Sequence, residues 1–133
     1  MHGLDAGMKW VMIVAGLLTC TMLYAAVSPQ EALQSTFGQT LEGPVADIVV
    51  RNWGVLIALM GAMLIYGAFN VSVRPLVLTV AGLSKIVFIV LILTIGQPFL
   101  SYQAGVAVVS DVLQVVLFFG YLVTRRSLAP APA

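Results

Sequence analysis

The sequence predicts an all-α integral membrane protein, a four-transmembrane-helix bundle with a short helix in its first outer loop. Of the 133 residues, 61% are hydrophobic and 8% are charged, whereas a soluble domain usually carries about 25% charged residues. A helix needs about 20 apolar residues to cross a hydrocarbon core of roughly 30 Å. Four stretches of the chain meet this requirement, which predicts four membrane spans.

One long and two short connections separate the predicted spans. The connections, residues 28–52, 70–75 and 96–103, contain turn or helix-breaking residues, and the short ones make neighbouring helices antiparallel. We expect residues 1–133 to form a single transmembrane domain, with residues 124–133 as a cytoplasmic tail. The four predicted spans cover about residues 10–27, 53–69, 76–95 and 104–123.

Basic residues near the span ends predict the orientation of the bundle. One side of the membrane has four basic residues near the span ends, Lys9, Arg74, Arg125 and Arg126, and the other side has Arg51. Because basic residues are retained on the cytoplasmic side, we expect both termini in the cytoplasm. The expected location is a bacterial inner membrane.

The long connection contains the signals for a short helix. Ser28 followed by Pro29 and Glu31 is typical of a helix start, since serine caps the first turn and proline at the first helical position loses no hydrogen bond. Gly38 predicts that this helix ends after Phe37. We expect it to lie at the membrane interface or over the mouth of the bundle.

A second break predicts that the next long helix begins outside the membrane. Gly43 and Pro44 form this break, so the helix is expected to start near Val45. Asp47 and Arg51 then lie four residues apart, which places them on one face of the helix extension.

Lys85 and Asp111 are charged residues near the middle of the third and fourth spans. Such a charge at the centre of a spanning helix costs roughly 2.5 to 3.5 kcal/mol, so these residues usually face the bundle interior or a pathway. Both lie at about the same depth on antiparallel neighbours. Two interpretations remain open: a buried ion pair that fixes which helices face each other, or a pair that lines an outward-facing cavity.

Further polar residues are candidates for lining such a cavity. Gln114 lies three residues after Asp111 and so shares its helix face. The cytoplasmic half of the bundle offers no comparable set. The candidate ligand-binding or cavity-lining residues are Arg51, Asn52, Gln97, Tyr102 and Gln114.

The sequence shows no pattern typical of a metal site, a catalytic site or a nucleic-acid-binding site. Cys20 is the only cysteine and His2 stands alone, so no metal site is expected. No phosphate-binding glycine loop, nucleophile elbow or pair of catalytic carboxylates appears. With a formal net charge of +1 and no basic run, nucleic acid is not an expected partner. Small residues at Gly54, Ala58 and Ala62 indicate either close helix packing or a homodimer.

Several weak motifs follow one another along residues 28–111. They consist of Pro29, Leu33, Phe37, Gly38, Asp47, Arg51, Gly54, Gly82, Lys85, Gly96, Pro98 and Asp111. In the order and spacing of these residues the chain resembles the DoxX-like family of small four-helix membrane proteins, and the resemblance implies the fold. In that family the basic residue of the third span is usually Arg and the acid of the fourth is often Glu, so Lys85 and Asp111 are departures that keep the charge.

The expected function is non-enzymatic. One hypothesis is an accessory subunit or interaction partner of a membrane complex, with Lys85 and Asp111 as its intramembrane pair. The alternative is a quinone- or lipid-binding protein whose polar cavity opens outward at the same pair. Some relatives are associated with quinone-linked oxidoreductases, but no residue here is expected to bind a redox centre. The expected partners are membrane lipids, other membrane subunits or a second copy, with quinone as the one candidate cofactor.

Overall fold

The computed structural model of the protein describes residues 2–128, and within this range every regular element is a helix, with no strand. Residues 129–133 of the predicted cytoplasmic tail lie outside the described residues. The elements are α1 (His2–Cys20), η1 (Thr21–Leu23), α2 (Tyr24–Val27), α3 (Pro29–Phe37), α4 (Pro44–Phe69), α5 (Arg74–Thr94), η2 (Gln97–Ser101) and α6 (Gln103–Leu128).

Four stretches are long and apolar enough to cross a membrane. The first is continuous through α1, η1 and α2 and runs over Gly3–Val27, and the others are α4, α5 and α6. The helices extend beyond the predicted spans; α4, with 26 residues, is roughly 39 Å long. A length greater than the roughly 30 Å hydrocarbon core is expected, because helices continue into the polar headgroup region.

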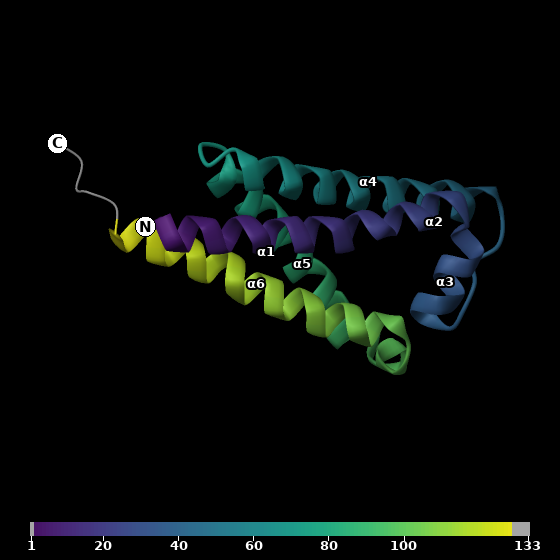
Figure 1. Cartoon of the computed structure of the whole chain (residues 1–133). Coiled ribbons are helices and arrows are strands. Elements are labelled where there is room, and N and C mark those ends of the chain that lie inside the picture. Colours follow the sequence, from purple (N-terminus) through teal and green to yellow (C-terminus); the bar gives the residue numbers. More distant parts are fainter. Residues whose placement is uncertain (1, 129–133) are drawn as a thin grey trace.

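The long helices pack as two antiparallel pairs. In Figure 1, α1 and α2 run along α4, and α5 runs along α6. Contacts between α4 and α5 join the pairs, whereas α1 touches α6 only lightly. The start of α1 and the end of α6 lie together at one end of the molecule, and α3 and the turn before α6 lie at the other.

The buried apolar side chains form three clusters. The main core lies toward the end with the termini and takes residues from all four long helices. Two smaller clusters occupy the α3 end, one between α2, α3 and α4 and one between α5 and α6, which we call the α5–α6 cluster. The main core contains Met8, Met12, Ala15, Leu64, Ala68, Val77, Leu78, Ala81, Phe118 and Tyr121.

Phe37, at the end of α3, joins the two smaller clusters. Its ring lies 6.1 Å from the ring of Trp53 on α4 and 5.4 Å, edge to face, from that of Phe99 in η2. The next residue, Gly38, has a φ of 71° and ends the helix, and the ring of Tyr102 occupies the space that a side chain at Gly38 would need. The short helix α3 is thereby fixed against both helix pairs.

Glycines allow the first helix pair to pack closely. A Cβ atom at Gly16 would lie 2.6 Å from Ile65 Cγ1, and one at Gly61 would lie 2.6 Å from the Gly16 carbonyl oxygen. A Cβ atom at Gly54 would meet α2 in the same way, 2.7 Å from the backbone nitrogen of Ala26. Close packing within the chain therefore accounts for Gly54, and a homodimer through this face stays a prediction.

The start of α4 agrees with the sequence pattern. Gly43 has a φ of 103° and precedes Pro44, the first residue of the helix. Asp47 and Arg51 lie one turn apart on α4, as predicted, and they form an ion pair in which Nε of Arg51 donates to Oδ2 of Asp47 at 2.9 Å. Arg51 also donates from Nη1 to the Ala26 carbonyl oxygen at 2.6 Å, which ties α4 to the end of α2.

Candidate functional site

The structure places Lys85 and Asp111 in contact between α5 and α6. Nζ of Lys85 donates to Oδ1 of Asp111 at 3.0 Å, and the side chains are 11% and 16% exposed. Lys85 lies four residues after the buried Ala81, and Asp111 lies three residues after the buried Val108. Both charges therefore belong to the inward faces of their helices.

The ion pair lies where one apolar cluster ends and another begins. On α5 it follows Ala81 of the main core and precedes Ile92 of the α5–α6 cluster. On α6 it lies between Val108 of the α5–α6 cluster and Phe118 of the main core. The two charged side chains therefore interrupt an otherwise apolar interface, and few other polar groups lie near them.

Gln114 adds a polar group to the same face of α6. The residue is 7% exposed, and its Nε2 donates to Oγ of Ser110 at 3.0 Å. No residue of 2–128 donates a hydrogen bond to its buried Oε1. If the amide oxygen and nitrogen exchanged places, the nitrogen would lack a partner instead. One buried polar atom of Gln114 therefore lacks a hydrogen-bond partner among residues 2–128 in either arrangement.

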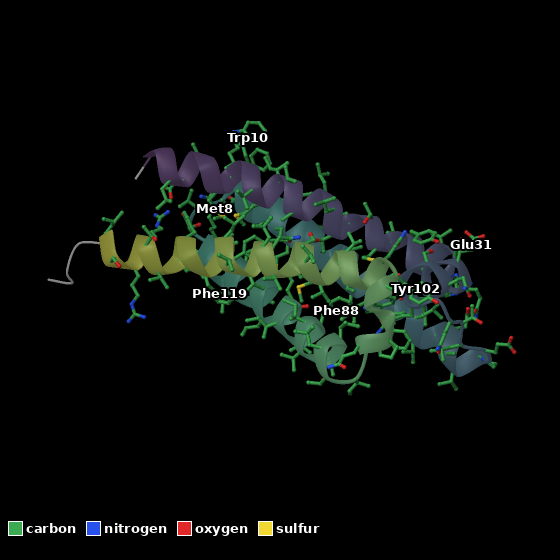
Figure 2. All side chains as sticks on the ribbon, turned by 90° about the horizontal axis from the view of Figure 1, so that it is seen from below. Met8, Trp10, Glu31, Phe88, Tyr102 and Phe119 are labelled. Carbon is green, nitrogen blue, oxygen red and sulfur yellow. The ribbon has the colours of Figure 1, made fainter. Side chains whose placement is uncertain are left out.

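An apolar cleft lies on the α3 side of the ion pair, and its lining does not include Lys85, Asp111 or Gln114. The cleft has a volume of about 370 Å³ and lies between α3, α4, α5 and η2. Four aromatic side chains line it, from Phe37, Trp53, Phe88 and Phe99, so we call it the aromatic cleft (Phe88 is labelled in Figure 2). Phe88 lies one helical turn beyond Lys85, so the cleft begins roughly 4.5 Å along α5 from the charge.

The other predicted lining residues have partners of their own. Arg51 bonds to Asp47 and Ala26 as described, and Gln97 donates from Nε2 to the Leu93 carbonyl oxygen at 2.8 Å. Both are exposed, as is Asn52. Tyr102 lies at the α3 end of the molecule, packed on Gly38 (Figure 2). Their participation in one cavity with the ion pair stays a prediction, whereas Gln114 shares the face of Asp111.

A second polar group lies at the end of the bundle where the termini meet, and the expectation that this half offers nothing comparable is wrong. Arg74, the first residue of α5, is 2% exposed. Its Nε donates to the Gly67 carbonyl oxygen at 3.1 Å and its Nη2 to that of Ala68 at 2.8 Å. Its Nη1 donates to the Asp5 carbonyl oxygen at 3.2 Å and to the Tyr121 hydroxyl at 3.3 Å.

The carboxylate of Asp5 completes this group, which we call the terminal cluster: Asp5, Arg74, Tyr121 and Arg125. Oδ1 of Asp5 accepts from the Tyr121 hydroxyl at 2.6 Å and from Nη1 of Arg125 at 2.7 Å. Nη1 of Arg125 also donates to the Tyr121 hydroxyl at 2.8 Å. The terminal cluster therefore connects α1, α5 and α6, and through Arg74 it reaches the end of α4.

One sequence signal pointed to the terminal cluster. Arg74 stands immediately before Pro75 at the start of a helix, where the helix dipole disfavours a cation. A cation in that position needs other acceptors, which here are the carbonyl groups at the end of α4. The sequence prediction used Arg74 only for the orientation of the bundle, and so it missed the need of this cation for acceptors.

Comparison of the chain with models of protein families, with curated proteins and with solved structures finds no match. The resemblance to the DoxX-like family therefore stays a prediction. The fold itself defines the class: an all-helical protein with four helices that are long and apolar enough to span a membrane.

Proposed function

We propose that this protein is a small multi-pass membrane protein that binds an apolar molecule with a polar head, a quinone or a lipid. Lys85, Asp111 and Gln114 contact the head, and the aromatic cleft holds the apolar part. The protein itself performs no chemistry in this proposal. Quinone is the ligand class that suits both halves of the site.

The observation that carries the proposal is the buried, unpaired amide atom of Gln114. Leaving a buried acceptor without a donor costs about 1 to 3 kcal/mol, and a ligand hydroxyl relieves that cost. The Lys85 ammonium has three N–H donors, one of which points to Asp111, so it can also donate to a ligand carbonyl oxygen. A quinone head offers carbonyl oxygens, and its reduced form offers hydroxyl groups, so both forms match these groups.

The aromatic cleft supports the same ligand class. A volume of about 370 Å³ falls within the usual range for small-molecule sites, which are apolar with a few well-placed polar groups. Aromatic side chains such as those of Phe37 and Trp53 offer large apolar surfaces. The apolar tail of a quinone or a lipid therefore fits this end of the site better than a water-soluble metabolite would.

We place this site in the outer half of a bacterial inner membrane, with α3 on the outer surface. Lys9, Arg74, Arg125 and Arg126 all lie toward the opposite end, and an excess of basic residues is typical of the cytoplasmic side. The aromatic cleft then takes its ligand from the outer leaflet. The family resemblance supports the same class of ligand, because some DoxX-like proteins are associated with quinone-linked enzymes.

Tryptophan fluorescence tests the proposal directly. The chain has two tryptophans, and Trp53 lines the cleft whereas Trp10 is 64% exposed on the outside of α1, so Trp10→Phe leaves a reporter inside the site. Titration with the hydroquinone form of a decyl-substituted benzoquinone, whose hydroxyl groups can donate to Oε1 of Gln114, should quench Trp53 saturably. Gln114→Leu should weaken this binding roughly 5-fold, the effect of losing one hydrogen bond of about 1 kcal/mol.

Asn70→Leu, a change of a partly exposed amide between α4 and α5, at the end of the bundle away from the cleft, serves as the matched control and should leave the affinity unchanged. Quenching that rises without saturation, or equal affinity for Gln114→Leu and the control, would overturn the proposal.

Mass spectrometry after gentle detergent extraction separates the two hypotheses about function. A stoichiometric quinone or lipid supports the binding protein, whereas a stoichiometric protein without a small molecule supports the accessory subunit.

A further inference from the structure

An apolar groove runs between α1 and α6 at the end of the bundle that carries the terminal cluster. Its volume is about 390 Å³. Apolar side chains of both helices line it, among them Met8, which Figure 2 labels between the ribbons of α1 and α6. Tyr121 belongs to the groove and to the terminal cluster at once. The groove therefore leads directly to a charged group.

Three glycines create the groove. Gly3 and Gly7 on α1 and Gly120 on α6 all line it, and a Cβ atom added at any of them would meet nothing within 4 Å. Close packing explains glycines such as Gly16 and Gly61, where an added Cβ would collide with a neighbouring helix. Glycine is a poor helix former, so the three groove glycines need another reason. Their common effect is open space between α1 and α6.

The terminal cluster beside this groove has an excess of positive charge. It contains two guanidinium groups, Arg74 and Arg125, and one carboxylate, Asp5, which leaves a net charge of +1. The Arg125 side chain is 30% exposed, and its bonds to Asp5 and Tyr121 both come from Nη1. Since a guanidinium carries five N–H donors, Arg125 can also bind an external anion.

We propose that the groove holds an acyl chain of an anionic phospholipid, with the lipid phosphate bound to Arg125. On α1 the lining runs from Gly3 to Val11, a rise of roughly 12 Å. That length is close to half of a hydrocarbon core of about 30 Å, the depth reached by one leaflet. An apolar groove that ends at a net positive group therefore matches both parts of such a lipid.

A second copy of the chain is the competing occupant, because Gly3 and Gly7 have the spacing that lets transmembrane helices approach closely. Two copies inserted in the same orientation would bring their positive terminal clusters to the same depth. Like charges repel at such short range, whereas the phosphate of an anionic lipid neutralises the cluster. Charge complementarity thus favours the lipid. This site is separate from the one at Lys85 and does not depend on the proposed function.

Native mass spectrometry of the full chain in detergent tests this inference. Phosphatidylglycerol and phosphatidylcholine with identical chains are titrated separately, and we expect one phosphatidylglycerol to be retained at least 10-fold more tightly than phosphatidylcholine. Gly120→Leu fills the groove and should reduce retention of phosphatidylglycerol at least 5-fold. Arg125→Gln should abolish the preference for the anionic lipid.

Matched controls are Ala62→Leu, which adds the same side chain to an exposed position of α4, and Arg126→Gln, which removes the same charge from an exposed neighbour. Both should bind the lipid as the unmodified protein does. Val116→Phe, which fills the groove from another exposed position of α6, is the second variant if Gly120→Leu misfolds. Equal retention of the two lipids, or retention unaffected by either groove variant, would overturn the inference. A dimer that Gly120→Leu dissociates would identify the second copy as the occupant.

Discussion

Two arginines in this protein donate hydrogen bonds to the carbonyl ends of neighbouring helices. Arg74 donates to Gly67 and Ala68 in the last turn of α4, and Arg51 donates to Ala26 at the end of α2. The last carbonyl groups of a helix have no partner within it, and the helix dipole favours a cation there. Each arginine therefore satisfies a neighbouring helix end, which makes it a structural residue first.

We expect Arg74→Met to lower the free energy of unfolding by about 3 to 5 kcal/mol, because the change removes a charge that pairs with Asp5 and leaves the carbonyl oxygens of Asp5, Gly67 and Ala68 without its donors. Denaturant unfolding in mixed micelles measures the effect. Arg126→Met removes the same charge from an exposed side chain and should change stability by no more than about 0.5 kcal/mol. Similar losses for the two variants would show that Arg74 matters only as a surface charge.

The ion pair between Lys85 and Asp111 should appear as energetic coupling. Lys85→Met and Asp111→Asn each remove one charge and leave the other in an apolar interface, so each should destabilise the protein by about 3 to 5 kcal/mol. The double variant should lose clearly less than the sum of the two, because no unpaired charge remains. The same unfolding assay completes the cycle, and strictly additive losses would mean that the side chains do not interact.

Helix pairing depends on how glycine is used in each interface. Between α1 and α4, Gly16 and Gly61 bring the backbones so close that a Cβ atom at either position would lie within 3 Å of the other helix. Between α1 and α6, Gly7 and Gly120 face open space instead. The same residue type thus builds a tight interface on one side of α1 and a groove on the other.

Alanine at these positions should have opposite effects. Gly61→Ala forces the backbones of α1 and α4 apart and should cost about 1 to 3 kcal/mol of stability, as overpacked interfaces do. Gly120→Ala meets no neighbour and should stabilise the protein by up to about 1 kcal/mol, since alanine is the better helix former. Thermal unfolding of both variants in the same detergent compares them, and a loss for Gly120→Ala would show that the groove is closed in solution.

For the whole molecule, the two ends of the bundle are chemically distinct. One end carries the terminal cluster and both ends of the described chain, and the other carries α3 and the aromatic cleft. If the four long helices cross a membrane, these ends face different compartments. From the distribution of basic residues we propose that the positive end faces the cytoplasm.

Cysteine labelling measures this arrangement in intact cells. In a Cys20→Ala background, a cysteine at Gln39 should react with a membrane-impermeant maleimide added outside, because it follows α3. A cysteine at Ser127, near the end of α6, should react only after the membrane is permeabilised. Reaction of both positions from one side would contradict four crossings.

Hydropathy predicted the number and order of the long helices, because the length of an apolar run is a local property of the chain. Local signals also located Gly38 and Pro44, where a positive φ or a missing N–H ends or starts a helix. Counting residues along antiparallel helices placed Lys85 and Asp111 at one depth. These predictions needed no knowledge of how the helices pack.

The sequence by itself therefore determined the class of protein, the long helices and the level of the two interior charges. Only the tertiary structure decided that Asp5 meets Arg125, 120 residues away, and that Gln114 keeps a polar atom free beside Asp111. The physical reason is that the sequence of a helix that is apolar on all sides does not indicate which face turns inward, so it leaves the rotation of the helix about its axis open. Which residues meet across the bundle is settled only when the helices pack against one another.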